Sequence, residues 1–314
     1  MGQAQPPAHS RLAAAEAASA FAQNWRQSAP YRHAMALFAH CDETTSVEAV
    51  ADRATSLLAD AGWANDLIAP MIDALALDPW FDPPLRFSRD SLRTGGILID
   101  HPAVTITAAV LSAATLATAP RPATVVVPGR LSVVRYERAG GATLNLWRAE
   151  PAGADFSAAG APPCRPAGAV RLVDGLVRRI DGRTHAQLIE HATSDVVTLT
   201  ATIRTDSAAV MREYARSDGA LVRVAALDDA ASRTQMLAAL LRHAGRIDAA
   251  EAFDQASRDP AHFVRWAVMR EWLALDAATA LPRLRAMLHD PHAEVRDAAA
   301  QMVPLVEARL QCRE

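Results

Sequence analysis

The sequence predicts an α+β fold in three parts, because the spacing of its apolar residues changes twice along the 314 residues. Residues 1–90 place apolar side chains three and four apart, as in amphipathic helices. Residues 91–227 form short β-branched segments with a period of two, divided by turn pairs, which predicts an antiparallel β-sandwich or jelly roll. Helical spacing returns in residues 228–314. We expect an N-terminal helical segment, a central β-domain and a C-terminal helical domain.

Local signals indicate where the N-terminal helices begin and end. Thr45 is followed by Glu48 three residues later, a capping-box pattern that predicts a helix start. Gly62 is expected to end that helix. The next apolar stripe contains Pro70, so this helix is expected to be kinked there or to begin there. Three prolines within residues 79–84 then predict the end of the helical segment.

Four dipeptides in and just beyond the β-rich segments are typical of tight turns between paired antiparallel strands. We therefore expect a hairpin at each of them. They are Gly140-Gly141, Asp174-Gly175, Asp181-Gly182 and Asp218-Gly219.

The C-terminal region repeats the motif D-P-x-x-x-V-R-x-A, which begins at Asp259 and again 31 residues later at Asp290. Asp suits the residue that caps a helix, and Pro suits the first turn, where its missing N–H costs no hydrogen bond. We expect each Asp to cap the helix that follows it and to approach Arg265 or Arg296.

This motif resembles the HEAT repeats of helical solenoids. The resemblance implies a ladder in which the turn Asp and the Arg six residues later link neighbouring helix pairs, so that both Arg side chains are structural. Two repeats leave one apolar face uncovered, so residues 228–314 are expected to pack on the β-domain. Trp266 is expected at that contact or on a protein-binding surface. The motif residues are Asp259, Val264, Arg265, Ala267, Asp290, Val295, Arg296 and Ala298.

Composition excludes several classes of function. All 32 basic residues are Arg, so no reaction that needs a lysine, such as Schiff-base chemistry, is available. The net charge of −3 argues against nucleic acid as a partner, and no apolar run predicts a membrane span. Three scattered cysteines and the absence of a basic-then-apolar leader favour the cytoplasm.

The β-rich region resembles the cupin jelly roll more weakly. Metal-binding cupins carry two histidines two residues apart on one strand, and this chain contains no H-x-H sequence. The resemblance therefore implies the fold but no metal site, and no cofactor is expected.

The most basic stretch contains two candidate ligands for an anion, Arg178 and Arg183. Residues 121–226 hold 14 Arg and 10 acidic residues, whereas the remainder of the chain is acidic. Alternation along a strand would point Arg178 and Arg179 to opposite faces. A buried Arg needs either an anionic ligand or a salt bridge. The carboxylates available for a salt bridge are Asp174, Asp181 and Glu190.

Other reactive side chains are more simply explained as structural. His185 and His191 would lie about 20 Å apart along an extended strand, too far to bind one ion. His289 and His292 flank a turn and would need a third metal ligand from elsewhere. Cys164 lies in a proline-rich loop without a neighbouring His. We include His185 as a candidate binding residue and expect no metal site.

Two functions remain open. A helical tail without a catalytic motif favours a non-catalytic adaptor that binds a protein or peptide partner. The basic β-domain favours the alternative, a divergent cupin-type enzyme that acts on a small anionic or peptide substrate inside the barrel. Stoichiometric bound metal in the purified protein would count against the adaptor.

Overall fold

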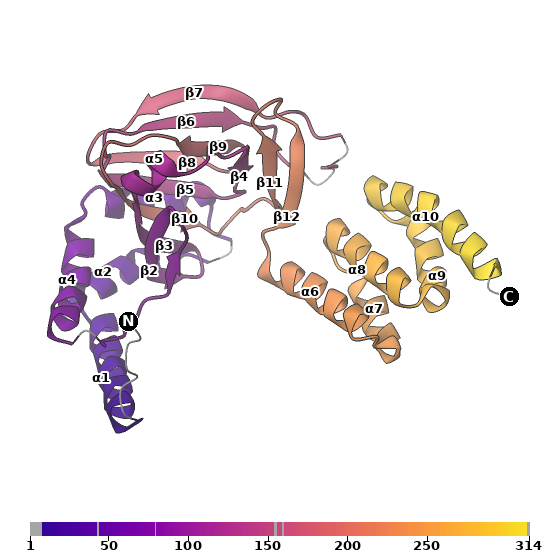
Figure 1. Ribbon diagram of the computed structural model, residues 1–314, viewed down its shortest axis with the longest axis horizontal. Coiled ribbons are helices and arrows are strands. Elements are labelled where there is room, and N and C mark those ends of the chain that lie inside the picture. Colours follow the sequence, from indigo (N-terminus) through magenta and orange to yellow (C-terminus); the bar gives the residue numbers. More distant parts are fainter. Residues whose placement is uncertain (1–7, 43, 79, 154–155, 159, 313–314) are drawn as a thin grey trace. The chain divides into compact units, whose positions relative to one another are not determined.

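The computed structural model is a mixed α+β protein with antiparallel sheets, which confirms the predicted class (Figure 1). The chain forms two compact units. Unit 1 comprises residues 1–149 and 164–207, and unit 2 comprises residues 150–163 and 208–314. The structure describes residues 8–42, 44–78, 80–153, 156–158 and 160–312.

The helices of unit 1 are α1 (Ala8–Arg26), α2 (Ala29–Phe38), α3 (Val47–Leu58) and α4 (Gly62–Leu77), followed later by the short α5 (Ala113–Thr118). These helices share a core with strands, so the N-terminal segment is not separate from the β-domain.

Two predictions about the helix ends are wrong. The residue that caps α3 is Ser46, whose hydroxyl accepts a hydrogen bond from the amide of Ala49 at 3.3 Å, whereas the Thr45 hydroxyl accepts one from the amide of Asp42. Gly62 begins α4 instead of ending α3. Pro70 lies inside α4, which continues through it.

Unit 1 contains two antiparallel sheets. The larger runs in the order β1-β2-β3-β10-β5-β8, and the smaller in the order β7-β6-β9. The strands of the larger sheet are β1 (Phe87–Arg89), β2 (Arg93–His101), β3 (Val104–Leu111), β5 (Leu131–Arg138), β8 (Leu176–Asp181) and β10 (Val196–Ile203). The smaller sheet contains β6 (Thr143–Arg148), β7 (Arg165–Arg171) and β9 (His185–Ile189), and β4 (Thr124–Val127) lies beside β9.

Three of the four predicted hairpins are instead crossings between the two sheets. Gly140-Gly141 joins β5 to β6, Asp174-Gly175 joins β7 to β8, and Asp181-Gly182 joins β8 to β9, and each pair of strands belongs to different sheets. Gly140 and Gly141 have φ values of +59° and +65°, which Gly adopts without strain. Such a turn reverses the chain, but it does not decide whether the flanking strands pair.

The fourth pair, Asp218-Gly219, does form a hairpin. It joins β11 (Val210–Ala215) and β12 (Leu221–Ala226), which pair antiparallel in unit 2.

Both faces of the six-stranded sheet are covered. One face packs on α2, α3 and α4 through a core that includes Phe38, Leu58, Ile106 and Leu199. The other face shares a second core with the smaller sheet, including Val134, Tyr136, Leu144 and Ile180.

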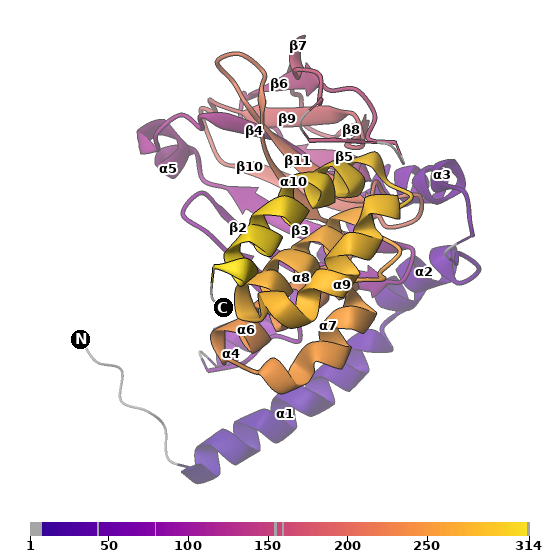
Figure 2. The same cartoon turned by 90° about the vertical axis from the view of Figure 1, so that its right-hand side faces the viewer.

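The helices of unit 2 are α6 (Asp229–His243), α7 (Ala250–Ala256), α8 (His262–Leu275), α9 (Ala277–Ala286) and α10 (Ala293–Gln311). Helix α8 packs against α6, α7 and α9, and α9 packs against α10 (Figure 2). Their shared core includes Phe253, Val264, Val268, Leu284 and Val295. Among the described helices of both units, none is long and apolar enough to cross a membrane.

Candidate functional site

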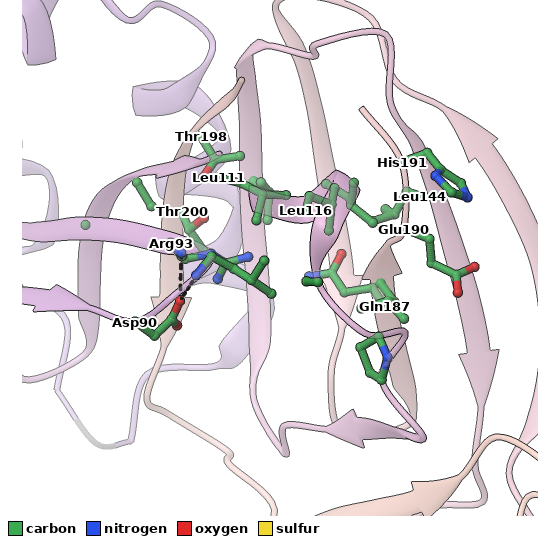
Figure 3. Close-up of a pocket in the computed structure, with 18 of the residues that line it drawn as sticks. Asp90, Arg93, Leu111, Leu116, Leu144, Gln187, Glu190, His191, Thr198 and Thr200 are labelled. Carbon is green, nitrogen blue, oxygen red and sulfur yellow. Dashed lines mark hydrogen bonds between the residues drawn. The ribbon is translucent and has the colours of Figure 1, made fainter. Parts of the chain in front are cut away.

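A cavity of about 660 Å³ lies in unit 1 between the six-stranded sheet, β9 and the segment after α5 (Figure 3). Its volume is in the range typical of small-molecule sites. Leu111, Leu116 and Leu144 form apolar parts of the wall, and the lining as a whole is a mixture of polar and apolar residues.

Threonines of β10 form one side of this cavity. Thr198, Thr200 and Thr202 line it, whereas the alternate residues Leu199 and Ala201 are buried in the core against the helices. The register continues this polar stripe onto β3, where Thr107 is opposite Thr200, whereas the partner of Thr200 on β5 is the apolar Val134. A period of two therefore separates a hydroxyl-bearing face from an apolar face.

Arg178 faces the same side of the sheet as the cavity. Its cross-strand partner on β5 is Val134, and directly paired residues project to one face. The side chain is half-buried, and its Nε is buried with no hydrogen-bond partner among the residues that the structure describes. Within that same part of the chain, Arg178 makes no ion pair.

Arg179 points the opposite way, as the alternation predicts. Its guanidinium bonds to Asp52 at 2.5 Å and lies 3.5 Å from Glu48, both near α3. It also donates to the Thr55 hydroxyl at 2.9 Å. Adjacent arginines of one strand thus differ sharply, since one is neutralised by the helices and the other faces the cavity side.

Two more polar side chains reach into the cavity from opposite sides, Arg93 of β2 and Gln187 of β9 (Figure 3). The Gln187 Oε1 is buried, and no described residue donates a hydrogen bond to it. Asp90 at the cavity wall is already engaged, because its carboxylate accepts the amides of Arg93 and Leu92 at 2.7 Å each. These hydrogen bonds hold the pKa of Asp90 below its usual value.

Glu190 and Tyr136 are two further titratable residues that line the cavity. Glu190 accepts a hydrogen bond from Asn145 at 2.9 Å, and its carboxylate points away from Arg93 (Figure 3). Burial raises the pKa of Tyr136 to about 12, although Arg178 and Arg93 act in the opposite direction. Tyr136 is therefore a neutral hydroxyl that can donate or accept a hydrogen bond.

None of the predicted residues Arg178, Arg183 and His185 is part of the cavity lining, although the cross-strand partner of Arg178, Val134, is. Arg183 forms ion pairs with Asp181 at 2.9 Å and with Asp206, which is the salt-bridge alternative. The His185 Nδ1 lies 2.9 Å from the Thr184 hydroxyl. His191, which was not a predicted binding residue, does line the cavity.

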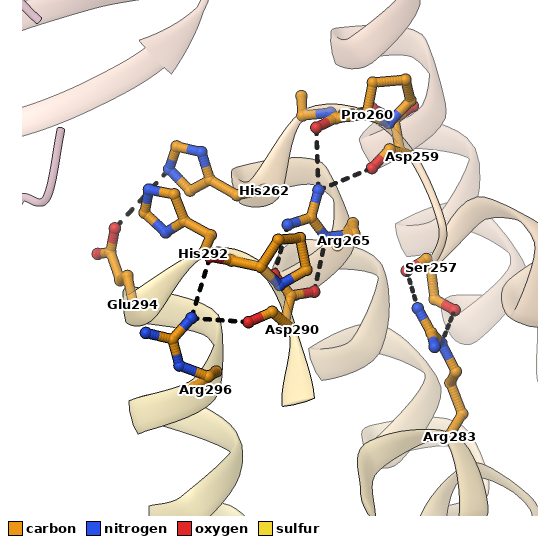
Figure 4. A network of polar contacts seen from close by, with 12 residues as sticks. Ser257, Asp259, Pro260, His262, Arg265, Arg283, Asp290, His292, Glu294 and Arg296 are labelled. Carbon is orange, nitrogen blue, oxygen red and sulfur yellow. Dashed lines mark hydrogen bonds and ion pairs between the residues drawn. The ribbon is translucent and has the colours of Figure 1, made fainter. Parts of the chain in front are cut away.

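The repeat residues lie together in unit 2 (Figure 4). Arg265 binds Asp290 through two hydrogen bonds, of 2.8 and 2.5 Å, and also contacts the Asp259 carbonyl at 3.0 Å. Arg296 donates to the Asp290 carbonyl at 2.8 Å. Trp266 is half-buried and packs against the helical core.

The prediction that the two turn aspartates cap the following helices is wrong, because each lies two residues before the capping position. Each accepts the amide two residues ahead, Asp259 from Ala261 at 2.8 Å and Asp290 from His292 at 2.9 Å. Each of these hydrogen bonds closes a turn just before the helix, because the capping positions of α8 and α10 are Ala261 and His292.

Sequence reasoning missed most of the cavity residues. Arg93, Gln187 and the β10 threonines are not marked by any motif. The available signal was the T-L-T-A-T-I run of β10, in which hydroxyl and apolar residues alternate. A strand buried on both faces is usually apolar throughout, so this alternation indicates a polar space on one side.

No family model and no curated protein matches the chain. Solved structures with some similarity include a cupin domain from Bordetella pertussis, 14% identical, covering 38% of this chain and 99% of that one, with a TM-score of 0.24. A sugar phosphate isomerase from a cupin superfamily of Silicibacter pomeroyi is 12% identical, covering 42% and 76%, with a TM-score of 0.24.

The 7S globulin of Momordica charantia is 10% identical, covering 42% of this chain and 35% of that one, with a TM-score of 0.25. This chain thus spans about a third of the globulin's length. Similarities as distant as these assign neither a ligand nor a reaction to the chain.

Proposed function

We propose that unit 1 binds a small anionic molecule in the cavity between its two sheets. The observation that carries the proposal is Arg178, a half-buried Arg on the cavity side whose Nε has no partner among the described residues. Removing a charge from water without a counter-charge costs several kcal/mol, so a bound anion would stabilise this arrangement.

The groups that line the cavity favour an oxygen-rich anion. Arg93 and Arg121 line the cavity and add positive charge, and guanidinium groups bind carboxylate and phosphate through paired hydrogen bonds. The hydroxyls of Thr198, Thr200 and Tyr136 and the amide of Gln187 match ligand hydroxyl groups. A hydroxy acid or a phosphorylated polyol combines both features.

We further infer that the two sheets of unit 1 form a cupin-like jelly roll, supported by the crossings from one sheet to the other at three turns. The chain has no H-x-H pair, so anion binding would depend on the arginines. Asp90 has a lowered pKa and is not a proton donor at neutral pH. Glu190 and His191 also line the cavity, so the cupin-type enzyme stays a prediction beside anion binding.

The adaptor role and the HEAT resemblance of the C-terminal helices remain predictions. The Arg265–Asp290 contact between the two turns supports the repeat, but no described feature of unit 2 identifies a protein or peptide partner.

Calorimetric titration of the full chain with phosphate, sulfate, citrate and gluconate tests the proposal. Wild type and Arg178→Leu are compared with Arg179→Leu, which removes the same charge from the opposite face. A charge-assisted hydrogen bond contributes about 1.5–3 kcal/mol, so Arg178→Leu should weaken binding about 10- to 100-fold. Equal affinity in all three proteins, or no binding by wild type, would overturn the proposal.

A further inference from the structure

The two repeat turns lie side by side in unit 2 because Arg265 of the first binds Asp290 of the second (Figure 4). The imidazole rings of His262 and His292, one from each turn, are stacked with centroids 3.6 Å apart and planes 3° from parallel. The Nε2 of His262 lies 3.8 Å from an oxygen of Glu294. One ligand atom from each of these three residues lies within 4.8 Å of the others.

The environment of the two ring nitrogens of His292 is unusual for a structural histidine. Both of its ring nitrogens are buried, and neither has a hydrogen-bond partner in the part of the chain that the structure describes. A buried nitrogen without a partner costs about 1–3 kcal/mol. A core histidine of purely structural role normally gives at least one ring nitrogen to a hydrogen bond.

We propose that His262, His292 and Glu294 form a binding site for a divalent transition metal ion. Two imidazoles and a carboxylate suit Zn²⁺ and neighbouring first-row ions, which bind nitrogen at about 2.0–2.1 Å. Metal coordination would also give one buried nitrogen of His292 a partner.

Binding of a metal ion would require a rotation of one of the two imidazole rings. The lone pair of an imidazole nitrogen lies in the ring plane, so the lone pairs of two parallel rings do not converge on one point. One ring must therefore turn about its Cβ–Cγ bond when the ion binds. The Glu294 side chain is 37% exposed, which leaves room for it to approach and leaves a fourth position open to water.

The charged neighbours are compatible with a cation. Arg265 is neutralised by Asp290, and Arg296 donates to the carbonyls of Asp290 and Pro291. Glu294 contributes a negative charge.

Such a site would join the first residues of α8 and α10 and add to the Arg265–Asp290 contact. Metal would then stabilise unit 2 in proportion to its occupancy, because a ligand that binds only the folded state raises the free energy of unfolding.

The test uses the untagged full chain, stripped with a chelator and titrated with Co²⁺ while the visible d–d absorption is recorded. All proteins carry Cys312→Ser, because Cys312 is exposed and its thiol could bind metal. His292→Ala and Glu294→Gln are compared with His289→Ala, an exposed histidine three residues from His292 that lies outside the cluster.

Wild type is expected to bind one Co²⁺ with a visible spectrum, and His289→Ala should match it. His292→Ala and Glu294→Gln should weaken binding by at least the 10- to 100-fold that loss of an outer-shell partner costs. Glu294→Gln keeps the size of the side chain, and circular dichroism verifies folding. No binding by wild type, or equal binding by wild type and His292→Ala, would overturn the proposal.

Discussion

Arg265 of unit 2 and Arg178 of unit 1 show two different uses of a buried arginine. The Arg265 side chain is 9% exposed and binds both carboxylate oxygens of Asp290, which is 4% exposed. Arg178 has a buried Nε with no partner within the described chain. The first arginine has its counter-ion from the protein and is structural, whereas the second is available to a ligand.

The difference follows from where each sequence pattern places a carboxylate. The D-P repeat brings the Asp of the second turn next to the Arg of the first. On β8, alternation turns Arg178 toward a face whose cross-strand neighbours are Val134 and Thr200, and turns Arg179 toward the acidic residues of α3. Removing Asp290 should therefore lower the stability of unit 2, whereas removing Arg178 should weaken anion binding by unit 1.

The largest effect is expected for Asp290→Ala, which leaves Arg265 buried and unpaired. Such a loss costs about 3–5 kcal/mol. Asp254→Ala, which breaks the exposed pair with Arg258, should cost less than about 1 kcal/mol. Urea unfolding of both variants with chelator present measures the difference. If Asp290→Ala lost no more than its control, the structural role of the pair would be disproved.

The two faces of β10 should respond differently to truncation. Leu199 is buried against the helices, so Leu199→Ala should lower the free energy of unfolding by about 2–5 kcal/mol. Thr200 borders the cavity and is half-buried, so Thr200→Ala should cost less than about 1 kcal/mol while weakening anion binding. Denaturant unfolding and calorimetry report the two effects separately, and equal losses of stability would contradict the assigned faces.

Arg178→Leu should leave stability unchanged within about 0.5 kcal/mol or raise it, because the substitution removes a charge that lacks a partner. Thermal unfolding in a buffer without multivalent anions measures this. Loss of more than about 2 kcal/mol would show that Arg178 has a structural partner, and the comparison with Arg265 would then fail.

A small pH effect is expected from Asp181, whose pKa is lowered chiefly by its hydrogen bonds with Arg183. A lowered folded-state pKa means that the stabilisation is complete above the unfolded value of about 3.8 and is lost as the pH falls through the folded value. The stability difference between wild type and Asp181→Asn should be under about 1 kcal/mol and should shrink below pH 4. A difference that stays constant from pH 6 to pH 3 would refute this.

The α+β class could be predicted from the sequence because residue spacing reflects local geometry. The turn pairs could not show that β5 and β6 belong to different sheets, since Gly140-Gly141 dictates a reversal and not a pairing. Likewise, His289 and His292 were compared within one turn, although His262 of the other repeat is the neighbour that the fold supplies. The strand residues that line the cavity come from seven strands, and they lie together only because the fold brings these strands into two facing sheets.

The most direct test of the account is a crystal structure of the full chain soaked with selenate, an anion that anomalous scattering can locate. The account predicts an anomalous peak in the unit 1 cavity within hydrogen-bonding distance of the Arg178 guanidinium, and its absence in crystals of Arg178→Leu. A cavity without selenate in wild type, with Arg178 paired to a carboxylate of the chain, would contradict it.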